Sequence, residues 1–210
     1  MKVLRRPAIV AVSVVLAWVP GLLATPAQSL NPQQISAAIA WGRTTRPEPY
    51  DLRSAFTRTK TPAGHVYTPY LRVALAARFA AERGLDFTVH DVTSEMKEPL
   101  VYFAVRDEGA PALMAPDIAP SMRLVIPRAE PPAGERVHVS PTWMATTLPE
   151  YLHSREAGQH ARYVVAAFPI GLLRAGTRVE VRRVMAKPNG GALIHTIPGS
   201  ITARDLADWK

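Results

Sequence analysis

Residues 138–160 hold the side chains in this sequence that are best suited to chemistry. They include three histidines and two glutamates: His138, Glu150, His153, Glu156 and His160. If a short helix begins at residue 149, Glu150 and His153 share one face at i, i+3 spacing, and His160 completes a His/His/Glu set. Such a set would serve a metal-dependent or carboxylate-dependent hydrolase. Nothing in the spacing demands a metal, so we expect neither a metal nor another cofactor.

The same segment carries two large aromatic side chains, Trp143 and Tyr151. They could form an apolar platform for a sugar ring or a peptide, or they could pack the loop onto the rest of the domain. The second interpretation is favoured, because large aromatic side chains usually dominate local burial. If the segment does bind a ligand, the candidate binding residues are Trp143, Glu150, Tyr151, His153 and His160.

Recognised catalytic motifs are missing from the sequence. It contains no G-x-S-x-G, S-x-x-K, H-E-x-x-H, Walker or G-x-G-x-x-G pattern. It also contains no cysteine, which excludes disulfides, thiolate zinc sites and a cysteine nucleophile. We therefore assign no catalytic residue.

Short segments of alternating apolar residues predict the elements that position the candidate residues. They lie at 100–106, 121–127, 135–140, 162–168, 178–185 and 192–197. Such alternation is typical of half-buried β-strands, and Asn189-Gly190 favours a hairpin between the last two. Residues 97–210 approach the size of an immunoglobulin-like sandwich, about 100 residues. We expect an antiparallel β-sandwich by analogy with that fold, ending in a short helix docked by Leu206 and Trp209.

The predicted strand at 135–140 places its valines and its histidine on opposite faces. Val137 and Val139 alternate with His138. We expect the two valines to face inward. His138 is accordingly interpreted as a solvent-facing imidazole rather than a ligand.

Residues 28–96 are predicted to form a helical N-terminal region packed on the sandwich, which makes the fold α+β. Asn31-Pro32 is a typical helix start, and Gly42 is expected to end that helix. A hairpin with its turn at 62–64 is expected next. The strongest helix spans 69–83, between a Thr68 cap and a Gly84 stop. It is apolar on two sides, so we expect it to pack on two sides.

Residues 1–27 have the pattern of a secretory signal peptide. A basic start precedes the apolar residues 8–19, and cleavage after Ala27 fits the small-x-small rule. The alternative is an uncleaved anchor, since residues 8–24 reach the short limit of a membrane span. We therefore expect an exported protein, periplasmic or extracellular, whose only membrane contact is this segment if it stays uncleaved.

The charge of the chain changes when the export signal is removed. The formal net charge is +8, from 25 basic and 17 acidic residues. Without residues 1–27 it falls to +5, from 22 basic and 17 acidic residues. The basic residues are spread along the chain, and the one adjacent pair of the remaining sequence is Arg182-Arg183. A nucleic-acid partner is not expected, because such proteins usually cluster their basic residues.

Three functions remain after these exclusions. The favoured one is an exported, non-enzymatic module that binds a partner protein or a component of the cell envelope. The second is a metal-dependent or carboxylate-dependent hydrolase that uses residues 138–160. The third is a structural or assembly factor of the envelope, retained by its apolar N-terminus. A hydrolase should bring at least three of the five His and Glu side chains within about 5 Å of one point.

Overall fold

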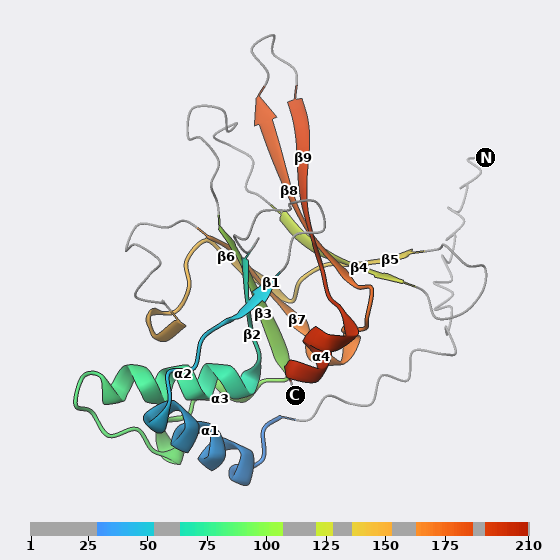
Figure 1. Cartoon of the computed structure of the whole chain (residues 1–210). Helices are drawn as coiled ribbons and strands as arrows, with labels where there is room; N and C mark the ends of the chain where they lie inside the picture. The colour runs from blue at the N-terminus through green and yellow to red at the C-terminus, as the bar shows by residue number, and fades with distance from the viewer. Residues whose placement is uncertain are drawn as a thin grey trace, which may run out of the picture.

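The computed structural model describes residues 29–52, 64–106, 121–127, 136–152, 163–186 and 192–209 (Figure 1). Within these ranges the chain is a mixed α+β protein with two antiparallel sheets. The expected signal segment 1–27 and the expected turns at 62–63 and 187–191 lie outside the described residues.

The five-stranded sheet has the order β1-β2-β3-β7-β6, and the four-stranded sheet has the order β5-β4-β8-β9. The strands of the first sheet are β1 (Tyr50–Leu52), β2 (Gly64–Tyr67), β3 (Leu100–Arg106), β7 (Tyr163–Pro169) and β6 (Trp143–Ala145). Those of the second are β5 (Arg136–Val139), β4 (Ser121–Pro127), β8 (Arg178–Ala186) and β9 (Ala192–Ser200). The helices are α1 (Pro32–Thr44), α2 (Pro69–Ala81), α3 (Ser94–Lys97) and α4 (Ala203–Asp208), with 3-10 turns η1 (Val89–Asp91), η3 (Glu150–Leu152) and η4 (Ile170–Leu172).

Local capping explains why the helices begin where they do. The Asn31 side chain accepts a hydrogen bond from the Gln34 amide, and the Gln34 side chain accepts one from the Asn31 amide. Thr68 caps α2 in the same position, with Pro69 as the first helical residue. These caps satisfy donors that a helix start leaves unpaired. Gly84 follows α2 with φ +68°, so the predicted stop of this helix is confirmed.

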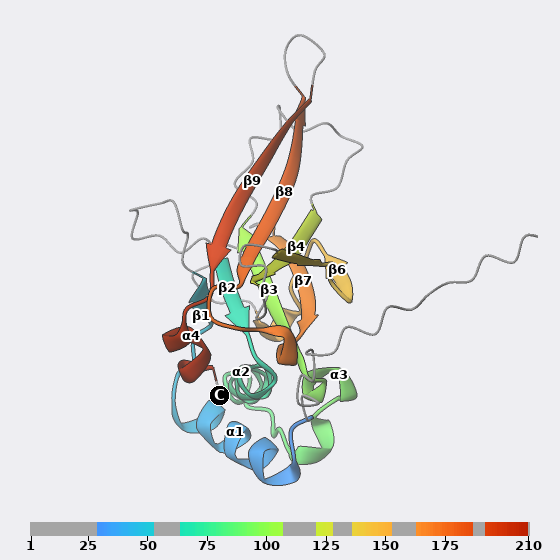
Figure 2. The same cartoon turned by 90° about the vertical axis from the view of Figure 1, so that its right-hand side faces the viewer.

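Helix α2 packs on two sides, as its sequence predicts (Figure 2). Leu71 and Leu75 pack with Tyr102 and Ala104 of β3 on one face of the five-stranded sheet. On its other side, α2 contributes small residues to a cluster shared with α1 and α3: Val73, Ala74, Ala76 and Ala77. Helix α2 thus lies between the sheet and the cluster of α1 and α3, and these two helices also touch the sheet directly, through Trp41 of α1 and through the hydrogen bond from the Tyr102 hydroxyl to Glu95 of α3.

The predicted end of the first helix at Gly42 is wrong. Helix α1 continues to Thr44, and Gly42 is a buried residue within it. A Cβ atom at this position would lie 2.1 Å from the carbonyl oxygen of Ala74 on α2. Glycine is needed here for the close approach of the two helices, because no side chain fits between them.

The two sheets share one hydrophobic cluster. It combines inward-facing residues of β3 and β7 with those of β4 and β8: Val101, Phe103, Val105, Val164, Ala166, Phe168, Met122, Leu124, Ile126, Val179 and Val181. The predicted docking of the C-terminal helix is confirmed, because Trp209 is buried in this cluster and Leu206 packs against it. The Trp209 ring lies 6.5 Å from the Phe103 ring and 6.1 Å from the Tyr50 ring.

The six predicted strands are present, but the sheets contain more than them. Strand β2 belongs to the region 28–96 that was expected to be helical, but it pairs with β3 of the region 97–210. The five-stranded sheet therefore combines strands from both expected regions. Gly64, expected in a turn, is the first residue of β2. Strand β6 escaped prediction because its three residues, Trp-Met-Ala, are too short to show alternation.

Candidate functional site

Of the five His and Glu candidates in residues 138–160, the structure describes two, His138 and Glu150, and it places them on different sheets or beside different elements. His138 is exposed on β5 of the four-stranded sheet, as expected. Glu150 lies on η3, where its Oε1 accepts a hydrogen bond of 3.1 Å from Arg83 at the end of α2. His153, Glu156 and His160 lie outside the described residues. Within the described ranges, no group of three His, Asp or Glu side chains is arranged to hold a metal ion.

The aromatic candidates pack against the five-stranded sheet. The Trp143 ring meets the Tyr102 ring edge-on, with centroids 4.8 Å apart. Tyr151 packs against both the sheet cluster and the helix cluster. Its hydroxyl is buried without a hydrogen-bond partner among the described residues, and burial raises the pKa of Tyr151 to about 12. Both rings therefore belong to the packing of the fold, not to an open platform.

Arg72 of α2 is the buried polar residue that sequence analysis missed. It is fully buried, and its guanidinium donates hydrogen bonds of 2.9, 2.8 and 3.1 Å to the carbonyls of Glu95, Glu98 and Leu100. It also lies 3.9 Å from the centre of the Tyr102 ring. Burial lowers the pKa of the guanidinium. Because its Nη1 and Nη2 atoms already bind backbone, Arg72 holds the α3–β3 connection onto α2 and is not presented to a ligand.

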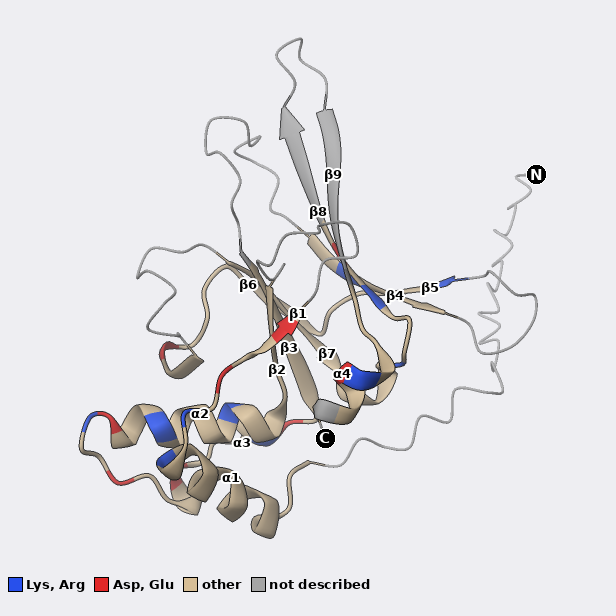
Figure 3. Ribbon diagram, viewed as in Figure 1, with Lys and Arg blue, Asp and Glu red and all other residues tan. Residues whose placement is uncertain are grey.

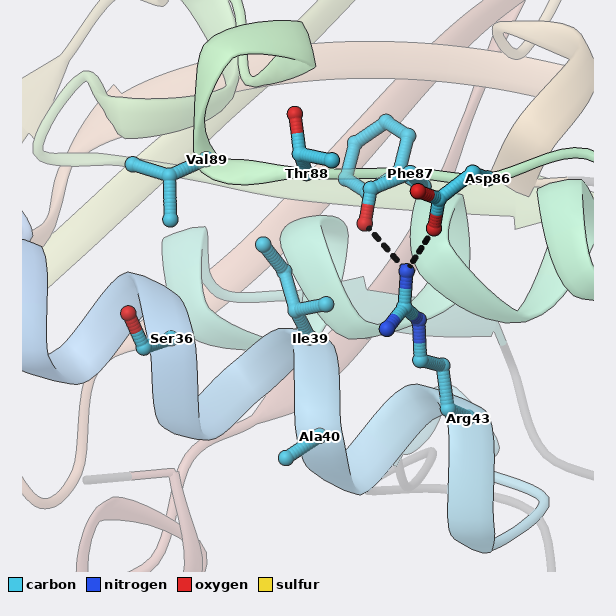
Figure 4. Close-up of a pocket in the computed structure, with 8 residues that line it drawn as sticks. All are labelled: Ser36, Ile39, Ala40, Arg43, Asp86, Phe87, Thr88 and Val89. Carbon is cyan, nitrogen blue, oxygen red and sulfur yellow. Dashed lines mark hydrogen bonds and ion pairs between the residues drawn. The ribbon is translucent and has the colours of Figure 1, made fainter.

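An open cleft of about 310 Å³ lies between α1 and the segment 86–89 (Figure 4). Arg43 bridges it by donating hydrogen bonds to the Asp86 carboxylate and the Phe87 carbonyl. The other polar side chains are also engaged, since the Ser36 hydroxyl donates to the Pro32 carbonyl and that of Thr88 to Asp91. The cleft therefore offers apolar surface and carries no unengaged nucleophile or base among the residues that line it.

A second cleft of about 370 Å³ lies where α1 and α2 end, and three arginines line it: Arg43, Arg46 and Arg78. Arg78 binds Glu82 at 2.9 Å and the Pro47 carbonyl at 3.2 Å. Helix C-termini carry partial negative charge, and basic residues in the last turn balance it. This arrangement accounts for Arg43 and Arg78, which are basic residues of the last turns of α1 and α2.

Charge is divided unevenly between the two sheets (Figure 3). Among the side chains that the structure describes, those of the four-stranded sheet, of 170–177 and of 201–209 include five basic and two acidic residues, a formal net charge of +3. Those of the helices α1 to α3, of the five-stranded sheet and of their connections include six basic and eight acidic residues. The excess positive charge of the described chain therefore belongs to the four-stranded sheet and the segments beside it.

The strand register places three of these cations, Arg123, Arg136 and Arg178, on one face. Leu124 of β4 and Val179 of β8 point into the shared cluster, so their neighbours Arg123 and Arg178 lie on the outer face. Arg123 makes two hydrogen bonds, of 2.9 and 2.8 Å, to one carboxylate oxygen of Glu180. On β5, His138 stands opposite Val125, which in turn stands opposite Arg178. Glu180 lies on the same face opposite Arg123, and we call this face, with Arg123, Arg136, His138, Arg178 and Glu180, the basic face.

Strand β5 forms one edge of the basic face. Arg136, Val137 and His138 are all exposed, and Val139 packs in part against the shared cluster. Val137 faces inward as expected, since it stands opposite the buried Ile126, but it remains 39% exposed at this edge.

Comparison with known proteins supplies no relative: no protein-family model, no curated protein and no solved structure matches this chain. None of the helices in the described ranges is long and apolar enough to span a membrane.

Proposed function

We propose that this chain is an exported, non-enzymatic module that binds an acidic partner protein at the basic face. The observation that carries this proposal is the uneven charge, +3 for the described side chains around the four-stranded sheet against an acidic excess elsewhere in the described chain. A face of one sign raises the association rate of a partner of opposite sign and excludes partners of like sign.

We propose further that the two sheets form a sandwich of the immunoglobulin-like kind, which serves as the scaffold. The cluster shared by β3, β4, β7 and β8 supports this arrangement. Such scaffolds present strand edges and sheet faces to partners without any need for catalytic residues. Export would be directed by residues 1–27, whose basic start and apolar stretch support it.

The hydrolase and the envelope factor are less well supported. Of the hydrolase candidates that the structure describes, Glu150 is engaged by Arg83 and His138 belongs to the other sheet, so these two do not share a site. An envelope factor retained by its N-terminus depends on residues 1–27 remaining attached. That alternative is tested by fractionation of cells that express the full chain: we expect soluble protein that begins near residue 28, whereas intact chain in the membrane fraction would favour retention.

Charge reversal on the basic face tests the proposed binding. The full chain is expressed in a bacterium, and the form that accumulates is purified and titrated with fluorescent poly-L-glutamate at 50 and 300 mM salt. Exposed ion pairs contribute about 0.2–1 kcal/mol each, and reversal adds repulsion. The double variant R136E/R178E is therefore expected to bind about tenfold more weakly, which corresponds to about 1.4 kcal/mol.

A matched control separates the basic face from net charge. The variant R46E/K97E makes the same charge change in the helical part, where Arg46 is exposed and Lys97 half-buried. We expect it to bind within about twofold of the parent, with both affinities weakened by salt. Equal losses in the two double variants would refute a localised site. Binding to vesicles with anionic lipids but not to poly-L-glutamate would replace the partner protein by a membrane surface.

A further inference from the structure

Strand β5 has the features of an edge that accepts another strand. In the described chain it pairs only with β4, so its other edge is not part of any described sheet pairing. Three of its four residues are exposed. An exposed edge presents unpaired main-chain donors and acceptors to an incoming chain.

The side chains of β5 alternate between two kinds of surface. Arg136 and His138 lie on the basic face, opposite Pro127 and Val125. Val137 lies on the inner face opposite Ile126 and remains 39% exposed. A strand added beside β5 would thus meet a cation, an apolar side chain and an imidazole in consecutive positions.

We propose that the acidic partner binds by adding an extended segment to the free edge of β5, with the pattern acidic, apolar, acidic opposite Arg136, Val137 and His138. This inference rests on the proposed function and specifies how the partner is recognised. Directly opposite side chains in a strand pair lie about 5 Å apart, close enough for ion pairs and apolar contact. Strand addition takes its affinity from main-chain hydrogen bonds and its specificity from such alternating contacts.

The other strand edges in the described chain fit an acidic segment less well. Strand β1 carries Asp51, which is exposed and would repel it. Strand β6 has no charged residue, and Trp143 and Ala145 pack against the helix side of the sheet. Strand β9, the other edge of the four-stranded sheet, has no lysine or arginine. Charge complementarity therefore selects β5. Arg136 could instead serve only to prevent self-association, since charged residues on edge strands do so in many proteins.

The probe is the capped peptide acetyl-Thr-Glu-Val-Glu-Thr-amide, titrated to 2 mM against ¹⁵N-labelled protein purified from expression of the full chain. We expect saturable shifts of the amide signals of residues 136–139 and NOEs between the two backbones. Two peptides serve as controls: one has Lys in place of both Glu residues, and one has N-methyl groups on alternate amides. Each is expected to bind at least tenfold more weakly, the first for lack of charge and the second for lack of main-chain donors.

A matched pair of variants checks the position of the bound segment. Val137 and Met144 are exposed to nearly the same extent, 39% and 38%, but Met144 lies on β6. We expect V137N to weaken peptide binding at least threefold and M144N to leave it unchanged. Circular dichroism of both variants establishes that the fold is intact before the titrations are compared.

The outcomes separate this inference from the proposed function. If the N-methylated peptide binds as well as the parent peptide, or if V137N and M144N bind alike, strand addition is refuted while binding at the basic face stands. If poly-L-glutamate also fails to bind, the proposed function fails as well. If no peptide shifts the β5 signals at 2 mM and R136S forms dimers in light scattering, Arg136 only protects the edge and the inference is overturned.

Discussion

Replacement of Arg72 by methionine is predicted to destabilise the protein strongly. The guanidinium is fully buried and donates hydrogen bonds to three carbonyls, that of Glu95 within α3 and those of Glu98 and Leu100 after it. Methionine has a similar length but no donor, so R72M removes all three hydrogen bonds, and of these acceptors the Glu98 carbonyl keeps a bond from the Leu100 amide. The cation–π contact with Tyr102 is lost as well.

The expected loss follows from opposing terms. Each hydrogen bond to a charged group contributes about 1.5–3 kcal/mol, but removal of the buried guanidinium also removes the cost of keeping it from water. The net loss expected for R72M is therefore about 3–5 kcal/mol, a large part of the 5–15 kcal/mol that stabilises a typical domain. The variant R72K keeps the charge but presents a compact ammonium, which cannot reproduce the geometry of the fork. We expect it to be no more stable than R72M.

Urea unfolding followed by circular dichroism and tryptophan fluorescence measures these losses. The control R46M changes an exposed arginine and should stay within about 0.5 kcal/mol of the parent. If R72M also lost less than about 1 kcal/mol, the three carbonyls would have other donors and the structural role of Arg72 would be refuted.

Three further predictions concern positions at which the helices meet the sheets. The variant G42A gains about 1 kcal/mol of helix propensity, but its Cβ atom would lie 2.1 Å from the Ala74 carbonyl oxygen. We expect its free energy of unfolding to fall by about 1–3 kcal/mol in total, with a lower melting temperature. Trp209 is buried in the cluster shared by the sheets. The variant W209A should therefore have a free energy of unfolding about 3–5 kcal/mol lower, and its near-UV dichroism should disappear at a lower urea concentration. The pKa of Tyr151 is 10 in the unfolded chain and about 12 in the folded protein, so its contribution to stability is present below pH 10 and lost between pH 10 and 12. The variant Y151F should therefore unfold at a higher alkaline pH. An unchanged midpoint of alkaline unfolding would contradict the burial of Tyr151.

Much of the local structure could be predicted because its causes lie within a few residues. The Asn31 cap, the Thr68 cap and the capping box between Thr202 and Asp205 each join residues three apart. The alternation that marks a strand is likewise visible within seven residues of β3 or β4. The end of α1 was mispredicted for the opposite reason, since Gly42 is required by a residue of another helix.

The candidate site was less predictable. Trp143 and Tyr151 pack against the five-stranded sheet, and the size of their rings favours such packing wherever they lie. Glu150 was grouped with the histidines by sequence distance, but its partner is Arg83, 67 residues away. Arg72 carried one signal in the sequence, its position on a helix predicted to be covered on two sides, where a long side chain has no route to solvent.

The sequence by itself determined most of the helices and strands, though not β6 or the end of α1, and it determined that thiol chemistry is excluded and that residues 1–27 have the composition of an export signal. Only the tertiary structure decided that β2 joins β3, that Arg123, Arg136 and Arg178 share one face, and that Val137 at the edge stays exposed. The reason is physical: capping and alternation are set by neighbours along the chain, whereas burial and electrostatic environment depend on which distant segments pack together.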